Sequence, residues 1–111
     1  MTIEMQGRYV VMTPSFEIIA ASDAYLQATM RSRDEIVGRT LFDVFFDEPD
    51  ASAARTVRQL TASVRRVLAD KRPDIMAIDK QGEGYWQRVN SPVLGEWGEV
   101  MYIMHHIEDV T

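Results

Sequence analysis

The spacing of apolar residues along this chain changes twice, and the changes predict strands, then helices, then strands again. Tyr9–Thr13 and Phe16–Ala21 are rich in β-branched and aromatic residues and are separated by Pro14-Ser15, a turn signal, so they predict a β-hairpin. From Ala51 to Lys71 the apolar residues recur every three or four positions, as on one face of a helix. This apolar stripe contains Val57, Leu60, Val64, Val67 and Leu68. Arg72-Pro73 predicts the end of this helix.

Three short helical segments are predicted between the hairpin and the long helix. Either residue of Ser22-Asp23 can cap a helix over Ala24–Met30 by accepting a hydrogen bond from an amide of its first turn. Ser32, followed three residues later by Glu35, is a capping-box pattern for a second helix. The apolar segment Leu41–Phe46 predicts a third helical turn packed on the core.

After the long helix the apolar period becomes two, which is typical of strands. Ile75–Ile78 predicts a strand, Lys80–Gly84 a hairpin loop and Tyr85–Leu94 the next strand. Gly95–Gly98 predicts a turn before a last strand, Val100–Thr111. Together with the first hairpin this predicts an α+β fold, a five-stranded antiparallel sheet with one face covered by the short helices and the long helix.

Composition and charge limit the class of protein. A chain of 111 residues forms one domain, which we place at residues 9–111 after a lead segment, 1–8. The net charge of −5 argues against nucleic acid or an anionic membrane as a partner. Four arginines recur at helical spacing and fit the solvent-facing side of the long helix: Arg55, Arg58, Arg65 and Arg66.

Two absences exclude further classes. The chain has no cysteine, which removes disulfides, thiolate metal sites and cysteine nucleophiles. No apolar segment approaches the roughly 18 residues that a bilayer-spanning helix needs, so we expect a cytoplasmic domain without direct membrane insertion.

Several local motifs then resemble one family. The segment Phe16–Leu26 resembles the second strand and first short helix of PAS domains, and Glu35–Phe45 resembles the E-x-x-G-x-x-L-F-x-x-F segment that follows in that family. Tyr85-Trp86 and Ser91–Leu94, and then the closing Asp109-Val110-Thr111, complete the pattern. The family usually has asparagine at the position of Ser22, a departure that changes the capping group but not the fold.

The resemblance implies a sensory or dimerisation module and not an enzyme. It is closest to the PAS domains at the front of bacterial histidine kinases and hybrid response regulators. It implies that Asp109 and Thr111 relay a signal to an output domain of a longer parent protein, which could itself be a kinase. Flavin–cysteinyl photochemistry is absent without cysteine, and 51–78 contains no histidine for haem, so we expect neither cofactor.

The last strand carries the main candidate for ligand binding. His105 and His106 are adjacent, so their side chains point to opposite faces and no single metal is expected between them. The apolar neighbours of His105 place it on the inner face, either as a hydrogen-bonded core residue or as a ligand anchor. The candidate ligand-binding residues are His105, Trp86, Asn90, Arg88, Ile103 and Tyr25. Arg88 is expected to find a carboxylate or to bend to the rim, because an unpaired buried guanidinium is costly.

Three functions remain open from the sequence. The first is a PAS sensory and dimerisation module, a homodimer through apolar groups on the outer sheet face, that relays a cue through its last strand. The second is a sensor that binds a small molecule or haem near His105. The third is a small cone-shaped α+β isomerase or hydrolase, for which His105 is the inward acid–base candidate.

Overall fold

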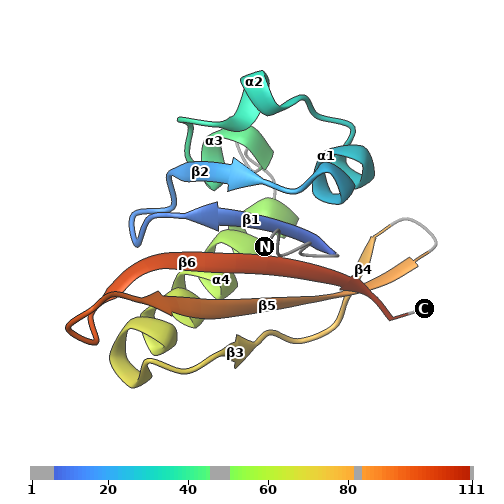
Figure 1. Cartoon of the computed structure of the whole chain (residues 1–111). Coiled ribbons are helices and arrows are strands. Elements are labelled where there is room, and N and C mark those ends of the chain that lie inside the picture. Colours follow the sequence, from blue (N-terminus) through green and yellow to red (C-terminus); the bar gives the residue numbers. More distant parts are fainter. Residues whose placement is uncertain (1–6, 46–50, 82–83, 111) are drawn as a thin grey trace.

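The computed structural model describes residues 7–45, 51–81 and 84–110, and in these ranges it is an antiparallel sheet with helices (Figure 1). The first half contains β1 Arg8–Met12, β2 Ile18–Ala21, α1 Asp23–Thr29, α2 Arg33–Ile36 and α3 Leu41–Phe45. The second half contains α4 Ala51–Asp70, β3 Asp74–Ile75, β4 Asp79–Gln81, β5 Gly84–Leu94 and β6 Val100–Asp109. The strand order is β2-β1-β6-β5-β3, and β4 also pairs with β5. The predicted α+β fold is confirmed, and the last strand lies at the centre of the sheet.

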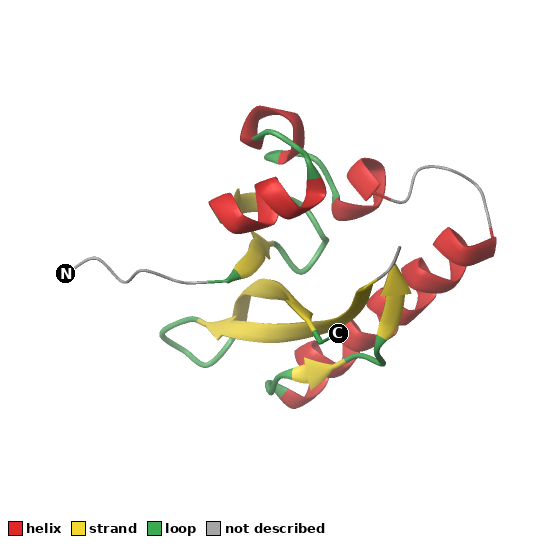
Figure 2. Cartoon of the chain, turned by 90° about the vertical axis from the view of Figure 1, so that its right-hand side faces the viewer, coloured by secondary structure: helices red, strands yellow, loops and turns green. Residues whose placement is uncertain are grey.

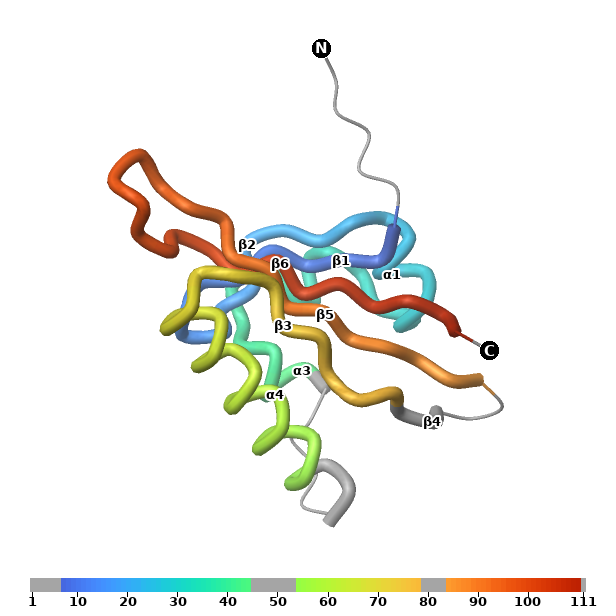
Figure 3. The backbone as a smooth tube through the Cα atoms, turned by 90° about the horizontal axis from the view of Figure 1, so that it is seen from below, coloured from blue at the N-terminus to red at the C-terminus, as the bar shows by residue number. Residues whose placement is uncertain are grey.

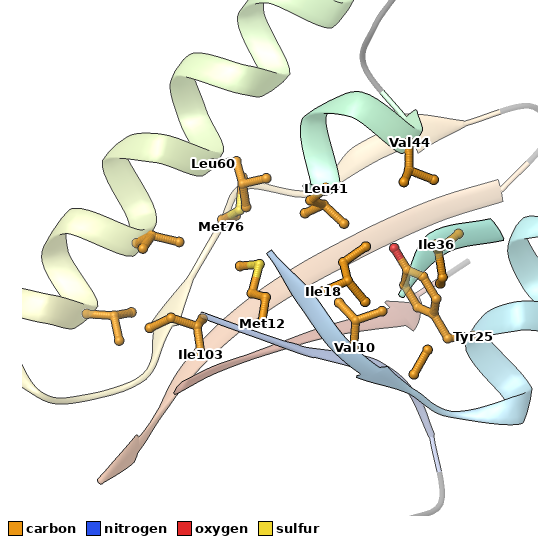
Figure 4. Packing of buried hydrophobic residues seen from close by; sticks show 13 residues of the cluster. Val10, Met12, Ile18, Tyr25, Ile36, Leu41, Val44, Leu60, Met76 and Ile103 are labelled. Atoms are coloured by element: carbon orange, nitrogen blue, oxygen red, sulfur yellow. The ribbon is translucent and has the colours of Figure 1, made fainter. Parts of the chain in front are cut away.

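The helices are packed on the sheet in two groups. The short helices α1, α2 and α3 lie at the end formed by β1 and β2, whereas α4 lies along β5 and β3 (Figure 1, Figure 2). Buried side chains from the four helices, from β1, β2 and β6, and from the segment between β3 and β4 form one core (Figure 4). Its members are Val10, Met12, Ile18, Ala21, Tyr25, Ile36, Leu41, Val44, Leu60, Val64, Val67, Met76 and Ile103.

The register of the sheet determines which side chains share a face. Directly opposed residues of antiparallel strands point to the same side. Val10, His105, Asn90 and Asp74 are opposed in turn across β1, β6, β5 and β3. The next row on the same face contains Arg8, Ile107 and Arg88. Polar residues of four strands therefore lie on the helix-covered face.

The predicted strand over Ile75–Ile78 is wrong in its extent. Of these residues only Ile75 belongs to a strand, β3, and 76–78 lie between β3 and β4, which both pair with β5. Three residues lie between Ile75 and Asp79, but only two lie between their partners on β5, Val89 and Trp86. The extra residue interrupts the hydrogen-bond ladder with β5 between β3 and β4. Lys80, Gln81 and Gly84, predicted in a loop, belong to strands.

Smaller differences have local causes. Phe16 lies outside β2 because its φ of 71° is left-handed, and its ring packs 4.5 Å from that of Phe42. Leu68, predicted on the apolar stripe of α4, is 37% exposed. Strand β6 ends at Asp109, two residues before the predicted end at Thr111.

Ser22 connects the start of β1 to α1. Its Oγ accepts hydrogen bonds from Tyr25 N at 3.2 Å and Tyr9 N at 3.1 Å, and donates to Gly7 O at 2.8 Å. The predicted cap is therefore confirmed, and serine performs it where the family usually has asparagine. The residues of the predicted capping box, Ser32 and Glu35, are also in contact. Ser32 N and Oγ both donate to Glu35 Oε1, at 3.3 and 2.9 Å.

Substitution of Ser22 is expected to destabilise the domain. Ser22→Ala removes the cap and leaves the Tyr9 amide without this acceptor, so the free energy of unfolding should fall by about 1–2 kcal/mol. Urea denaturation followed by circular dichroism measures the change. Ser15→Ala in the exposed turn is the control and should stay within about 0.5 kcal/mol of the parent. Equal losses in the two variants would contradict this role of Ser22.

Candidate functional site

His105 and Asn90 meet at the middle of the helix-covered face. Their side chains are 2% and 0% exposed, and His105 Nδ1 lies 2.8 Å from Asn90 Oδ1. The register explains this contact, because the two residues are directly opposed on neighbouring strands. The prediction that His105 points inward is confirmed, and His105 is a hydrogen-bonded core residue.

The contact continues across the core to the surface. Asn90 Nδ2 donates to Ser63 Oγ of α4 at 2.9 Å, and Ser63 Oγ donates to Asp74 Oδ2 at 2.6 Å. Arg66 donates to the same carboxylate through Nε at 2.8 Å and Nη2 at 2.9 Å. We call Arg66, Asp74, Ser63, Asn90 and His105 the polar network. It connects the long helix, the edge strand β3 and the two central strands.

The hydrogen bonds of the polar network all lead to the Asp74 carboxylate, from Arg66 on one side and from His105 through Asn90 and Ser63 on the other. Since Ser63 donates to Asp74 and accepts from Asn90, the Asn90 oxygen is left to accept from His105. The Nδ1 atom of His105 therefore carries the proton, and its Nε2 is an acceptor. Each donor points toward the Asp74 carboxylate, whose charge faces Arg66.

Burial and neighbouring charges determine the ionisation states. Burial, then the Arg88 charge, then His106 lower the pKa of His105 from 6.5 to about 3, so the imidazole is neutral at physiological pH. The hydrogen bonds from Arg66 and Ser63 lower the pKa of the Asp74 carboxyl and favour its charged form. The polar network is therefore charged at its exposed end and neutral at its buried end.

Three members of the polar network were missed from the sequence. Ser63 is the one with a usable signal, because it stands three residues after Leu60 and is thus a polar residue at a core-facing helix position. Arg66 was predicted only as a solvent-facing arginine, and its side chain is indeed 54% exposed. Asp74 gives no sequence signal of its own, because its contact depends on how α4 turns back onto β3.

Trp86 and Arg88 lie on the same helix-covered face of β5 as Asn90. A cavity of about 210 Å³ is lined by Ala28, Thr29, Trp86, Arg88 and Ile107. Arg88 is 8% exposed. Its expected carboxylate partner stays a prediction. The guanidinium carbon of Arg8 lies 4.9 Å from the centre of the Trp86 ring, a cation–π contact.

The other predicted residues are in different positions. Tyr25 and Ile103 are 4% and 0% exposed and belong to the hydrophobic core, where burial raises the pKa of Tyr25. Asp109 is exposed and opposes Trp86, and after it Val110 N donates to Tyr85 O at 2.8 Å. Thr111 lies outside the described residues. The six ligand-binding candidates thus divide among the polar network, the cavity and the core.

The profile of the PAS fold family matches residues 6–111. The chain belongs to the PAS family. The strand order, the central last strand and the helix-covered face described above are those of PAS domains, and the resemblance seen in the sequence is confirmed. In the described part of the PAS domain no helix is long and apolar enough to cross a membrane.

Relatives of this PAS domain include signalling proteins. It is 31% identical over 101 residues to a blue-light-activated histidine kinase of Rhizobium johnstonii, covering 88% of this chain and 28% of that protein. It resembles the structure of a sensory box sensor histidine kinase from Vibrio cholerae with a TM-score of 0.75 at 11% identity, over 97% of this chain and 84% of the other. It also resembles the structure of the PAS domain from Bordetella pertussis BvgS, with a TM-score of 0.75 at 21% identity, over 95% of this chain and 77% of the other. The solved structures show the fold alone, and this chain spans about a quarter of the length of its curated relative.

The light-activated relative makes a flavin the cofactor to compare with this PAS domain. A cysteinyl adduct is chemically excluded, since the sequence has no cysteine. The cavity of about 210 Å³ is also smaller than the roughly 300–1,000 Å³ of sites for drug-sized ligands. The described residues therefore do not fit a flavin in that cavity.

Proposed function

We propose that this PAS domain is a cytoplasmic sensory and dimerisation module of a bacterial signalling protein, and that it relays a cue through β6 to an output domain. The observation that carries the proposal is the position of β6. This strand pairs with β1 and β5, provides His105 to the inner face and His106 to the outer face, and continues into Asp109. A change on either face therefore acts on the strand that leads toward the C-terminus.

The outer sheet face supports the dimerisation half of the proposal. None of the described helices packs on this face (Figure 3). By the register this face carries nine apolar residues beside the polar Gln87, Ser91, His106 and Glu108. We call the apolar set the outer apolar face: Tyr9, Val11, Ala20, Ile75, Tyr85, Val89, Val93, Tyr102 and Met104. Ile75 is 64% exposed and Tyr85 45%. Exposed apolar surface of this kind is typical of an interface, and a second copy of the domain presents the same surface.

Solution size tests the proposal. We expect light scattering after size exclusion to give twice the chain mass, because burial of the outer apolar face stabilises a homodimer. Met104→Glu places a charge at the middle of this face and should give a monomer. Gln59→Glu adds the same charge at an exposed position of α4 and should leave the dimer intact.

Two outcomes would contradict this proposal. One is a strict monomer for the parent domain at high concentration, and the other is a dimer of unchanged affinity for Met104→Glu.

A second candidate function is ligand sensing on the inner face, which the sequence placed near His105. The observation that favours it is the cavity beside Trp86 and Arg88, since a nearly buried charged group at a cavity is typical of a binding site. We place the ligand in this cavity, one row of the sheet away from His105.

A further inference from the structure

The helix α1 leaves space above the sheet at the end of the domain where Arg8 and Arg88 lie. Ala24 and Ala28 are four residues apart, so they share one face of the helix. Ala28 lines the cavity with Arg88, and Ala24 lines a neighbouring hollow with Arg8, while Ile107 lines both. The small side chains of α1 thus leave two adjacent hollows over Ile107.

Two guanidinium groups flank these hollows. Arg8 and Arg88 are both opposed to Ile107 in the sheet, so they lie on either side of it on the same face. Arg8 also covers the Trp86 ring, which forms one wall of the cavity. The neighbouring hollow is also lined by Glu108 and Asp109, so its charges are mixed. Among the described residues that line the cavity, Arg88 is the one charged side chain, and it is 8% exposed.

We propose that the cavity between α1 and the β5–β6 strands binds a small organic carboxylate, with its charge on Arg88 and its apolar part between Trp86 and Ile107. This inference rests on the ligand-sensing candidate above and names the chemical class of the ligand. An arginine carries five N–H donors, so it can hold a carboxylate by two of them and retain its contacts within the protein.

The remaining lining residues limit what the ligand can be. The Thr29 hydroxyl donates to Tyr25 O at 2.8 Å, so it can only accept from a ligand and provides no donor to an anion. The binding energy for the charge must therefore come from the guanidinium groups. Ala28, Ile107 and the Trp86 ring provide an apolar surface, and about 210 Å³ suits a single small ring.

The experiment uses benzoate as the anionic probe and benzamide as its neutral counterpart. The chain has two tryptophans, and Trp97 is 86% exposed in the turn between β5 and β6. Trp97→Phe therefore leaves Trp86 as the single fluorophore in the cavity. In this background we expect a saturable change of Trp86 fluorescence with benzoate, and at least about tenfold weaker binding of benzamide, because a charge-assisted hydrogen bond is lost.

Two variants test the residues. Arg88→Met keeps the apolar stem and removes the charge, and should weaken benzoate at least about tenfold. Ala28→Leu fills the cavity and leaves Arg88 in place, so it should reduce binding similarly and decides the matter if Arg88→Met does not fold. Arg58→Met, at an exposed position of α4, is the matched control and should bind like the parent.

Three results would overturn the inference: no saturable change with benzoate, equal binding of benzamide, or parent-like binding by Ala28→Leu. None of these results depends on the outer apolar face. The measurement of the dimer therefore still tests the proposed function if the experiments show that no carboxylate binds.

Discussion

Asn90→Leu is expected to lower the free energy of unfolding by about 3 kcal/mol or more, because it removes the centre of the polar network. Leucine is close to asparagine in size but can neither accept from His105 Nδ1 nor donate to Ser63 Oγ. The imidazole donor is then buried without its acceptor, and each buried group that loses its partner costs about 1–3 kcal/mol. Urea denaturation at neutral pH, followed by circular dichroism, measures this loss.

The control and a second substitution separate this effect from a general loss of packing. Gln59→Leu makes the same exchange of an amide for leucine at an exposed position and should change stability by less than about 0.5 kcal/mol. Ser63→Ala combined with Asn90→Leu should cost less than the sum of the two single changes, because the residues share one hydrogen bond. Strict additivity, or a loss below about 1 kcal/mol for Asn90→Leu, would show that the polar network contributes little.

The fold could be predicted largely from local signals. The alternation of apolar residues on the last strand placed His105 inward and His106 outward, and the helical spacing placed Leu60, Val64 and Val67 in the core. Those positions follow from the geometry of single elements, since a strand alternates faces and a helix repeats every 3.6 residues. They do not depend on how elements meet.

Contacts between elements could not be predicted in the same way. The polar network depends on α4 placing Ser63 over Asn90 and on β3 opposing Asp74 to the same residue. The hydrogen bonds of Ser63 with Asn90 and with Asp74 join residues 27 and 11 positions apart in sequence, and no local pattern specifies such pairs. The break between β3 and β4 also could not be predicted. It arises because the segment from Ile75 to Asp79 has one residue more than the segment of β5 that it faces, and this depends on the register with β5.

The polar network also explains why a neutral histidine can lie at the centre of the sheet. Asn90 satisfies the histidine N–H, Ser63 satisfies the amide of Asn90, and Asp74 satisfies the serine hydroxyl. Each buried donor thus has an acceptor, and the single charge that results is placed at the surface with Arg66. The position of α4 is therefore coupled to the central strand by hydrogen bonds as well as by apolar packing.

His105 is expected to make the domain less stable as the pH falls below 6.5. Above this value the imidazole is neutral in both the folded and the unfolded chain, and it contributes nothing to the pH dependence. Below it the unfolded chain binds a proton that the folded chain does not accept until the pH approaches about 3. The free energy of unfolding should therefore fall by about 1.4 kcal/mol per pH unit in this window, or about 2 kcal/mol between about pH 7 and pH 5.

Urea denaturation of three proteins across this pH range tests the assignment. His105→Asn has an amide near the position of Nδ1 and does not titrate, so it should be less stable than the parent at neutral pH but should lose most of the pH dependence. His106→Asn should retain it. Asp74 does not obscure the result, because its pKa is lowered from 3.8 and its stabilising effect is lost only as the pH falls below that value. If His105→Asn showed the same fall in stability as the parent, the titrating group would have to be sought elsewhere in the chain.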